Sequence, residues 1–322
     1  MTTIIRRRKL GMSSCKGIAA FSKTGIGWIR SDKRLPEDDL YIRWGCTANV
    51  PTNNVLNTAE AIHRVNDKKA FRMLLNEHEL CPYTFDLGEG YRNLAVATFP
   101  AVIRPKKHAQ GKHTYLVEDW DEYGKALVLC QDGYGSEYIK KVSEYRIFVV
   151  QGRVACVAQK TPDNPDAIAW NVAKGGRFDN VRFDDWPLRA CKTAIEAFML
   201  SGLDFGGVDV MLDAEGKPYV LEINSAPSLT SPYRQECMAK CFDYIVEHGK
   251  ASIPLIEEKG GYRKFIHPAV SDRAQLVEDD LPGIVNPDVV IAAGEIIEKF
   301  YQNDPIQIAK YLYENNLLKD QL

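Results

Sequence analysis

One segment, GGVDVMLDAEGKPYVLEINSAPSL at residues 206–229, constrains the fold of this chain more than any other. Two apolar runs flank the polar turn DAEGK, a pattern that predicts a β-hairpin. Glu222 and Asn224 lie two residues apart on the second strand and therefore share a face, and Asp209 on the first strand lies close to that face. Two carboxylates among apolar residues are costly to bury unless a cation neutralises them, and such oxygen ligands suit Mg²⁺. We therefore expect a metal site here; a surface hairpin with outward polar side chains is the alternative.

The rest of the chain has an α+β pattern in which antiparallel hairpins dominate and no regular β-α-β alternation is seen. Short apolar runs predict further strands at residues 41–44, 99–103, 114–117, 126–129, 145–150 and 154–158. The dipeptide Gln151-Gly152 between the last two runs is a typical two-residue hairpin turn. Apolar residues at helical spacing predict helices over residues 58–80 and 188–201.

We expect three regions along the chain. Residues 1–60 form a mixed opening segment, residues 61–235 a central α+β domain and residues 236–322 a mostly helical extension. Within the extension, residues 288–303 have the apolar spacing of an amphipathic helix. Asp304-Pro305 then supplies an N-cap and a first-turn proline for a closing helix.

Charge and hydropathy exclude several classes of protein. The formal net charge of −2 gives no basic excess for non-specific nucleic-acid binding, and 45% hydrophobic residues exclude a disordered chain. The basic run Arg6–Lys9 is interpreted as a solvated end, with a phosphate or membrane contact as the alternative. No run approaches the ~20 apolar residues of a membrane span, and charges stand where a signal peptide needs its apolar core. We therefore expect a cytoplasmic protein that does not bind membranes.

The eight cysteines lie singly in apolar surroundings, without a C-x-x-C pair. This usage is typical of buried, reduced thiols in a reducing compartment. Cys237 and Cys241 lie one helical turn apart, but no second ligand pair has the spacing to complete a zinc site.

The common phosphate-binding and nucleophile motifs are missing from the sequence. Gly111-Lys112-His113 lacks the preceding glycine and the hydroxyl residue of a P-loop. Gly88 and Gly90 do not continue into the dinucleotide-binding pattern, and no G-x-S-x-G elbow is present. Any nucleotide site must therefore be built from residues that lie apart in the sequence.

Residues 206–229 closely resemble the metal-binding end of the ATP-grasp superfamily, in its RimK-like glutamate-ligase branch. D-alanine–D-alanine ligase and glutathione synthetase are more distant relatives. The resemblance covers roughly residues 62–232, over which several motifs occur in the expected order. It implies an ATP-grasp fold, in which two α+β subdomains clasp ATP, with a short N-terminal segment before them and a helical tail after them.

The resemblance also implies which residues bind ATP. In this family, cations at a helix start, at a strand end and in a lid loop reach the phosphates, a hinge backbone reads the adenine edge, and an acidic residue takes the ribose. The residues at these places are, in chain order, Lys68, Arg104, Lys112, Glu137, Tyr138, Ile139 and Glu144. Arg104 stands where a lysine is usual, and its planar fork keeps the charge while changing the reach.

A second implied set carries the chemistry. Arg146 and Lys160 correspond to cations that hold the migrating phosphoryl group, and Asn171 begins an Asn…Gly-Gly stretch of the family. Ala169 replaces an arginine expected nearby. The hairpin ligands Asp209, Glu222 and Asn224 would hold Mg²⁺, with Mn²⁺ as an alternative metal.

The implied activity is an ADP-forming carboxylate–amine ligation through an acylphosphate. The partners would be small-molecule or peptide carboxylates and amines, which the sequence does not identify, and a homo-oligomer is left open. Two alternatives stay open: an enzyme of the same fold with a hydroxyl, thiol or kinase-type acceptor, and a nucleotide-binding regulator without catalysis.

Overall fold

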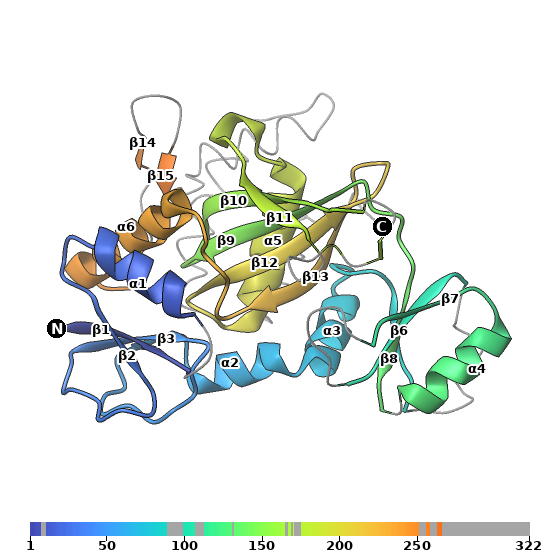
Figure 1. Ribbon diagram of the computed structural model, residues 1–322, viewed down its shortest axis with the longest axis horizontal. Coiled ribbons are helices and arrows are strands. Elements are labelled where there is room, and N and C mark those ends of the chain that lie inside the picture. The colour runs from blue at the N-terminus through green and yellow to red at the C-terminus, as the bar shows by residue number, and fades with distance from the viewer. Residues whose placement is uncertain are drawn as a thin grey trace, which may run out of the picture. The chain divides into compact units, whose positions relative to one another are not determined.

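The computed structural model describes residues 1–7, 11–88, 99–106, 113–130, 132–164, 167–168, 170, 175–250 and the backbone of two short strands, β14 (Ile256–Glu257) and β15 (Arg263–Phe265). The described residues belong to one compact unit that spans residues 1–267 (Figure 1). The helices predicted over residues 288–303 and from Asp304 onward lie outside the described residues.

The N-terminal segment is a parallel four-stranded sheet in the order β2-β1-β3-β4, with α1 packed beside it. Its elements are β1 (Thr2–Arg6), α1 (Met12–Phe21), β2 (Gly27–Arg30), β3 (Leu40–Trp44) and β4 (Val55–Leu56). Arg6 closes β1 opposite Trp44 and is only 3% exposed, so the interpretation of the basic run as a solvated end is wrong at this residue. The reason is that Arg6 packs against Trp28, with its guanidinium carbon 5.1 Å from the ring centroid.

Two helices, not one, follow this sheet: α2 (Ala59–Asn66) and α3 (Lys68–Glu77). Asp67 separates them because its side chain accepts a hydrogen bond from Ala70 N at 3.1 Å and so caps a new helix. The helical pattern over residues 58–80 is therefore divided at Asp67, in agreement with the helix start that the resemblance implies at Lys68. As a result, Lys68 lies in the first turn of α3.

A small antiparallel sheet comes next, in the order β5-β8-β6-β7. Its strands and helix are β5 (Thr84–Asp86), β6 (Ala101–Arg104), β7 (Tyr115–Val117), α4 (Trp120–Leu129) and β8 (Tyr134–Glu137). The strand predicted over residues 126–129 is wrong, because these residues end α4. Asp119 caps this helix, and Tyr123 and Ala126 bury one face of it, a spacing that a four-residue apolar run cannot reveal.

A large antiparallel sheet in the order β11-β10-β9-β12-β13 forms the centre of the unit (Figure 1). It contains β9 (Ser143–Val150), β10 (Arg153–Thr161), β11 (Arg177–Asn180), β12 (Phe205–Leu212) and β13 (Pro218–Asn224). The turn Gln151-Gly152 has φ values of 50° and 69°, as the predicted tight hairpin requires. Helix α5 (Leu188–Ser201), as predicted, packs against β9, β12 and β13.

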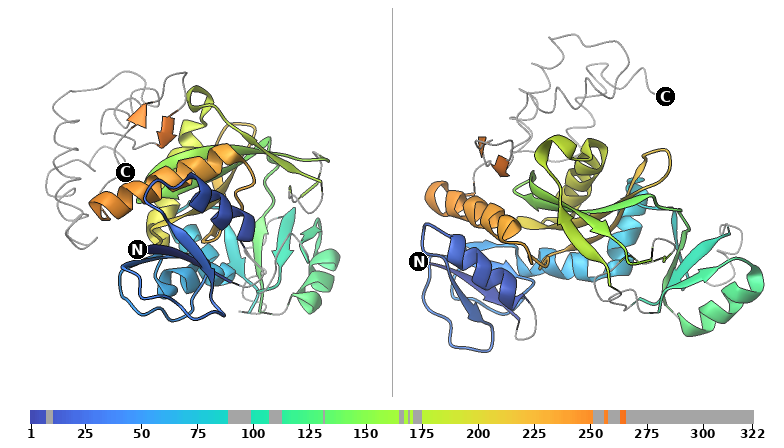
Figure 2. Two further views of the ribbon diagram at one scale, coloured as in Figure 1. Left: turned by 60° about the vertical axis from the view of Figure 1, so that its left-hand side comes forward. Right: turned by 45° about the horizontal axis from the view of Figure 1, so that its top comes forward.

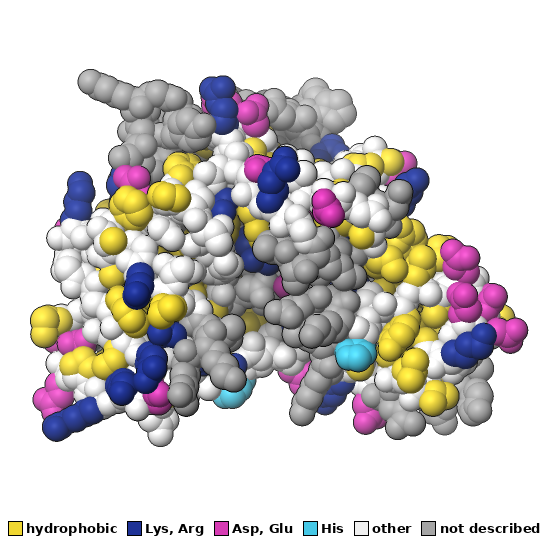
Figure 3. All heavy atoms as spheres, viewed as in Figure 1, with side chains coloured by type: hydrophobic (Ala, Val, Ile, Leu, Met, Phe, Trp, Pro, Cys, Tyr) yellow, Lys and Arg dark blue, Asp and Glu magenta, His cyan; other side chains and the backbone are white. Residues whose placement is uncertain are grey.

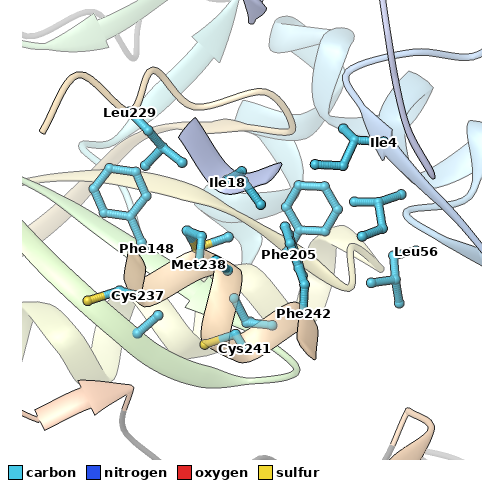
Figure 4. Packing of buried hydrophobic residues seen from close by; sticks show 14 of the residues in the cluster. Ile4, Ile18, Leu56, Phe148, Phe205, Leu229, Cys237, Met238, Cys241 and Phe242 are labelled. Carbon is cyan, nitrogen blue, oxygen red and sulfur yellow. The ribbon is translucent and has the colours of Figure 1, made fainter. Parts of the chain in front are cut away.

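Helix α6 (Pro232–His248) packs against β10. It lies beside α1, as both views of Figure 2 show. The core that they share, drawn in Figure 4, joins the N-terminal sheet to the large sheet through Phe205 and Phe242, among others. Asp243 of α6 also accepts hydrogen bonds from Ser22 Oγ and Thr24 Oγ1, both at 2.6 Å. The expected boundary between residues 235 and 236 thus falls within a helix whose residues pack continuously into the core.

All eight cysteines are buried and unpaired, as the sequence predicts. Within the described part of the chain, no helix combines the length and the apolar character needed to cross a membrane.

Candidate functional site

The two hairpin carboxylates lie directly opposite each other in the large sheet. Asp209 of β12 pairs with Glu222 of β13, and Asn224 pairs with Gly207 in the same ladder. Paired residues of an antiparallel ladder project on the same face, so the predicted proximity of the three side chains is confirmed. A β-bulge after Asp209 interrupts the register there.

Two cations from neighbouring strands bind Asp209. Arg146 of β9 makes a bidentate ion pair, with Nε 2.6 Å from Oδ1 and Nη2 2.7 Å from Oδ2. Lys160 Nζ of β10 lies 3.3 Å from Oδ2. Burial alone would lower the pKa of Lys160, but Asp209 and Glu144 raise it above its usual value, so the ammonium stays charged. The sheet therefore brings together two residues that the resemblance assigns to the chemistry.

Glu144, expected to take the ribose, is buried between two lysines. Its Oε1 accepts from Lys160, and its Oε2 lies 2.5 Å from Lys141 Nζ. The ring of Trp170 covers Lys141, with its centroid 4.5 Å from Nζ. Sequence reasoning missed Lys141, because it lies in the connection before β9, where no periodicity predicts which side chains meet. The ribose role of Glu144 stays a prediction, because both carboxylate oxygens already have cationic partners.

Glu222 is bound from α3 and from its own strand. Lys68 Nζ lies 2.7 Å from Oε2, and Asn224 Nδ2 donates to Oε1 at 3.0 Å. Burial alone would raise the pKa of this carboxyl, but Lys68, the hydrogen bond from Asn224 and the charge of Arg146 lower it to about 2. Glu222 is therefore ionised at neutral pH, with 34% of its side chain exposed for a ligand.

Two further arginines lie near Glu222. Arg104, at the end of β6, donates to Ser136 Oγ at 3.3 Å, and burial lowers its pKa. Arg72 of α3, which sequence reasoning missed, donates to Val220 O at 3.0 Å and Leu221 O at 2.6 Å. Arg72 thereby occupies backbone acceptors on the outer edge of β13 and holds that strand in place.

The predicted hinge, Glu137 to Ile139, connects the small sheet to the large one. Tyr138 N donates to Pro100 O at 3.0 Å on the side of the small sheet. Val142 N donates to Leu212 O at 2.9 Å on the side of the large sheet. The chain between these bonds therefore crosses from one subdomain to the other. Lys112 and Asn171, together with Ala169, lie outside the described residues.

The described residues fit a Mg²⁺–polyphosphate ligand. Asn224 Oδ1 accepts no hydrogen bond from any described residue, and the carboxylates beside it have spare lone pairs. Within the described ranges, no group of three His, Cys, Asp or Glu side chains could hold a metal alone. Mg²⁺ commonly shares its remaining positions with phosphates and water, so two carboxylates and an amide are a sufficient protein contribution.

The charge of the site suits an anion as well. Six cationic side chains surround three carboxylates. In the view of Figure 3, Lys and Arg side chains are seen near the middle of the molecular surface. The cations are Lys68, Arg72, Arg104, Lys141, Arg146 and Lys160, and the carboxylates are those of Glu144, Asp209 and Glu222. This excess of positive charge favours a triphosphate.

Comparison with known proteins identifies the same region. The RimK-like ATP-grasp domain matches residues 69–239. A probable alpha-L-glutamate ligase 2 of Hahella chejuensis is 28% identical over 60% of this chain and 66% of its own length. The chain thus spans slightly less than two thirds of this relative.

Solved structures share the fold at low sequence identity. D-alanine–D-alanine ligase from Bacillus anthracis, complexed with ATP, has a TM-score of 0.55 and 15% identity over 77% of this chain and 96% of its own. A RiPP-associated ATP-grasp ligase of Chryseobacterium gregarium, in complex with ADP and a leader and core peptide, has a TM-score of 0.55 and 13% identity. The latter match covers 82% of this chain and 98% of the other.

Proposed function

Because the chain belongs to the RimK-like ATP-grasp family, we propose that it is an ATP-dependent ligase that joins a carboxylate to an amine. The observation that carries this proposal is the arrangement around Asp209. Arg146 and Lys160 bind this carboxylate, while Lys68 binds its cross-strand partner Glu222. Phosphoryl transfer at this group of charges needs no nucleophilic side chain of the protein, because positioning and charge neutralisation are sufficient.

The first step would transfer the γ-phosphoryl group of ATP to an oxygen of the substrate carboxylate, which gives an acylphosphate and ADP. Lys68 and Arg104 would bind phosphate oxygens, and Arg146 and Lys160 would stabilise the charge of the transferred group. Asp209, by its bidentate ion pair, fixes the plane of the Arg146 guanidinium before the substrates bind. Mg²⁺ held by Asp209, Glu222 and Asn224 would supply neutralisation of phosphate charge.

The second step would be attack of an amine on the acyl carbon, with inorganic phosphate as the leaving group. The relative from Hahella is named a glutamate ligase, and the neighbour from Chryseobacterium is described with a leader and core peptide. These names support amino acids and peptides as substrates. We therefore propose glutamate as the first amine to test and peptides as the carboxylate partners.

The test combines the protein with ATP, Mg²⁺, glutamate and a peptide pool. We expect slow ATP turnover until both a carboxylate and an amine are present, and ADP as the nucleotide product. ¹⁸O placed in the reacting carboxylate should appear in the released phosphate, because that oxygen bridges carbon and phosphorus in the acylphosphate. Release of AMP, or phosphate without ¹⁸O, would rule out this mechanism.

A further inference from the structure

Helix α1 begins with an uncompensated N-terminus at the end of the parallel sheet. Its N-cap, Gly11, has no side chain to accept a hydrogen bond, and the first turn contains no acidic residue. Cys15 N donates back to Gly11 O at 2.9 Å, which closes the first helical bond and leaves the preceding N–H groups without an intrahelical acceptor. Such a helix end attracts an anion through its N–H groups and its dipole.

An independent observation points to a ligand at the same place. The Trp44 side chain is fully buried, and its indole Nε1 has no hydrogen-bond partner among the described residues. A Cβ atom added to Gly11 would lie 2.8 Å from this nitrogen, so the indole N–H lies directly beside the cap of α1. Burial of an N–H group without an acceptor costs free energy, which an oxygen ligand would recover.

Two cationic side chains, Arg6 of β1 and Lys16 of α1, lie over the ring of Trp28 in this part of the chain. Arg6 is the cross-strand partner of Trp44 and projects on the same side of the sheet. Its guanidinium carbon lies 5.1 Å from the ring centroid of Trp28, and Lys16 Nζ of α1 lies 5.7 Å from the same centroid. The ligand that matches these N–H donors and cations is an anion, and among the acid and amine substrates of the proposed ligase that anion is a carboxylate.

The loop that follows the metal ligands connects this point to the reaction site. Gly45 N, next to Trp44, donates to Ser225 O at 3.1 Å, and Ser225 directly follows Asn224. Leu229 N donates to Ser14 Oγ in the first turn of α1 at 3.0 Å. Leu229 lies five Cα–Cα steps after Asn224, so their Cα atoms are at most roughly 18 Å apart. In parallel sheets, ligands bind outside the carboxyl ends of the strands, where this loop lies.

We propose that the first turn of α1 and the Trp44 indole N–H bind a carboxylate of the substrate that does not react. This proposal rests on the proposed ligase function, which it deepens by assigning substrates with an additional carboxylate, such as acidic amino acids or the ends of peptides. The bound carboxylate would orient the reacting group of the same substrate toward Asn224 and the carboxylates beside it.

A binding experiment tests the site without turnover. The chain has five tryptophans, so an amide NMR spectrum of ¹⁵N-labelled protein contains five indole N–H signals, and Trp44→Phe identifies the relevant one. Titration with L-glutamate should shift this signal to saturation, whereas n-butylamine, which lacks a carboxylate, should leave it in place. A Trp44 signal that does not move with glutamate, at concentrations that saturate turnover, would overturn the proposal.

Kinetics provide a second test. Ser13 is exposed in the first turn of α1, and Ser13→Asp places a competing carboxylate there. The variant should raise the KM for glutamate at least tenfold, with the KM for ATP unchanged. It should not lower the melting temperature, because an acidic residue stabilises a helix N-terminus. A purely structural first turn predicts the same melting temperature behaviour but an unchanged KM for glutamate, so the KM distinguishes the two roles.

Trp44→Phe should likewise raise the KM for glutamate about tenfold. The matched control is Trp186→Phe, which removes another buried indole, one whose Nε1 donates to Val181 O at 3.3 Å. The control should leave the KM for glutamate unchanged. If ligation occurs and neither Ser13→Asp nor Trp44→Phe changes that KM, the carboxylate site is wrong while the ligase stands. If no acid and amine are joined, the ligase proposal fails independently of the NMR result.

Discussion

The large antiparallel sheet and the N-terminal parallel sheet differ in how their buried polar groups are paired. In the large sheet, Asp209 and Glu144 have a cation at each carboxylate oxygen. In and beside the N-terminal sheet, the buried Trp44 Nε1 and both oxygens of the buried Asp38 carboxylate have no hydrogen-bond partner within the part of the chain that the structure describes. Pairing fixes the large-sheet site before any substrate arrives, whereas the unpaired groups can gain partners only from a ligand or a rearrangement.

The largest effect should come from breaking the paired network at Asp209. Asp209→Asn removes the charge that binds Arg146 and Lys160, so both cations stay buried beside a neutral side chain. Loss of one member of a buried ion pair costs roughly 3 kcal/mol of stability. Because the metal ligand is lost too, ligation should fall by a factor of at least about 1,000.

The control for this variant is Asp184→Asn, which changes a carboxylate that is 65% exposed and only weakly paired with Arg182. It should alter the free energy of unfolding by less than about 0.5 kcal/mol and leave ADP release unchanged. Urea unfolding and ADP release measured on both variants provide the comparison. An active, wild-type-stable Asp209→Asn protein would contradict both the metal assignment and the paired network.

Lys141 provides the next largest effect. We expect it to act as a positioning residue, since it binds Glu144, and Glu144 binds Lys160. Lys141→Met should lower kcat roughly tenfold, a typical cost for a misplaced group, and change the KM for ATP much less. Lys141→Arg should restore part of the kcat. Lys140→Met, at the exposed neighbouring lysine, is the matched control and should behave as wild type.

The sequence predicted the paired network better than the unpaired sheet end. The spacing of Glu222 and Asn224 sets their shared face, since side chains of a strand alternate strictly. Arg146, two residues along β9 from Glu144, faces the same site for the same reason. Lys141 was missed because it precedes β9, in a connection whose path no periodicity describes.

Tertiary packing decided the remaining differences. The run at residues 126–129 is equally apolar in a helix or a strand, and only the cap at Asp119 distinguishes them. Arg6 looked solvated because its sequence neighbours are basic, although β2 and β3 enclose its strand. Whether the Trp44 indole N–H finds an acceptor depends on where β3 ends relative to α1. The local sequence does not determine this tertiary arrangement.

A smaller effect should follow acidification. The pKa of Glu222 is lowered to about 2 in the folded protein, below the ~4.3 of an unfolded glutamate. A lowered carboxyl pKa contributes stability that is fully present above the unfolded value and is lost as pH falls through the folded one. Glu222→Gln should therefore reduce the acid sensitivity of the urea midpoint between pH 4.5 and about 2, and leave its slope from pH 5 to 7 unchanged. An identical acid slope in wild type and variant would show that the Lys68–Glu222 pair is not formed in solution.

The smallest effect should be a gain in stability rather than a loss, and it tests most directly the difference between the paired and the unpaired buried groups. Asp38 is 6% exposed, and no described residue donates a hydrogen bond to either of its oxygens. Asp38→Asn keeps the shape and removes a buried charge that no hydrogen bond compensates, so it should stabilise the protein by about 1 kcal/mol at neutral pH. The same Asp→Asn change at Asp209 should destabilise it, because there the charge has partners. Urea unfolding of the two variants in one buffer measures both signs. If Asp38→Asn also destabilises the protein, Asp38 has a partner in solution, and the distinction between a paired and an unpaired sheet fails at that residue.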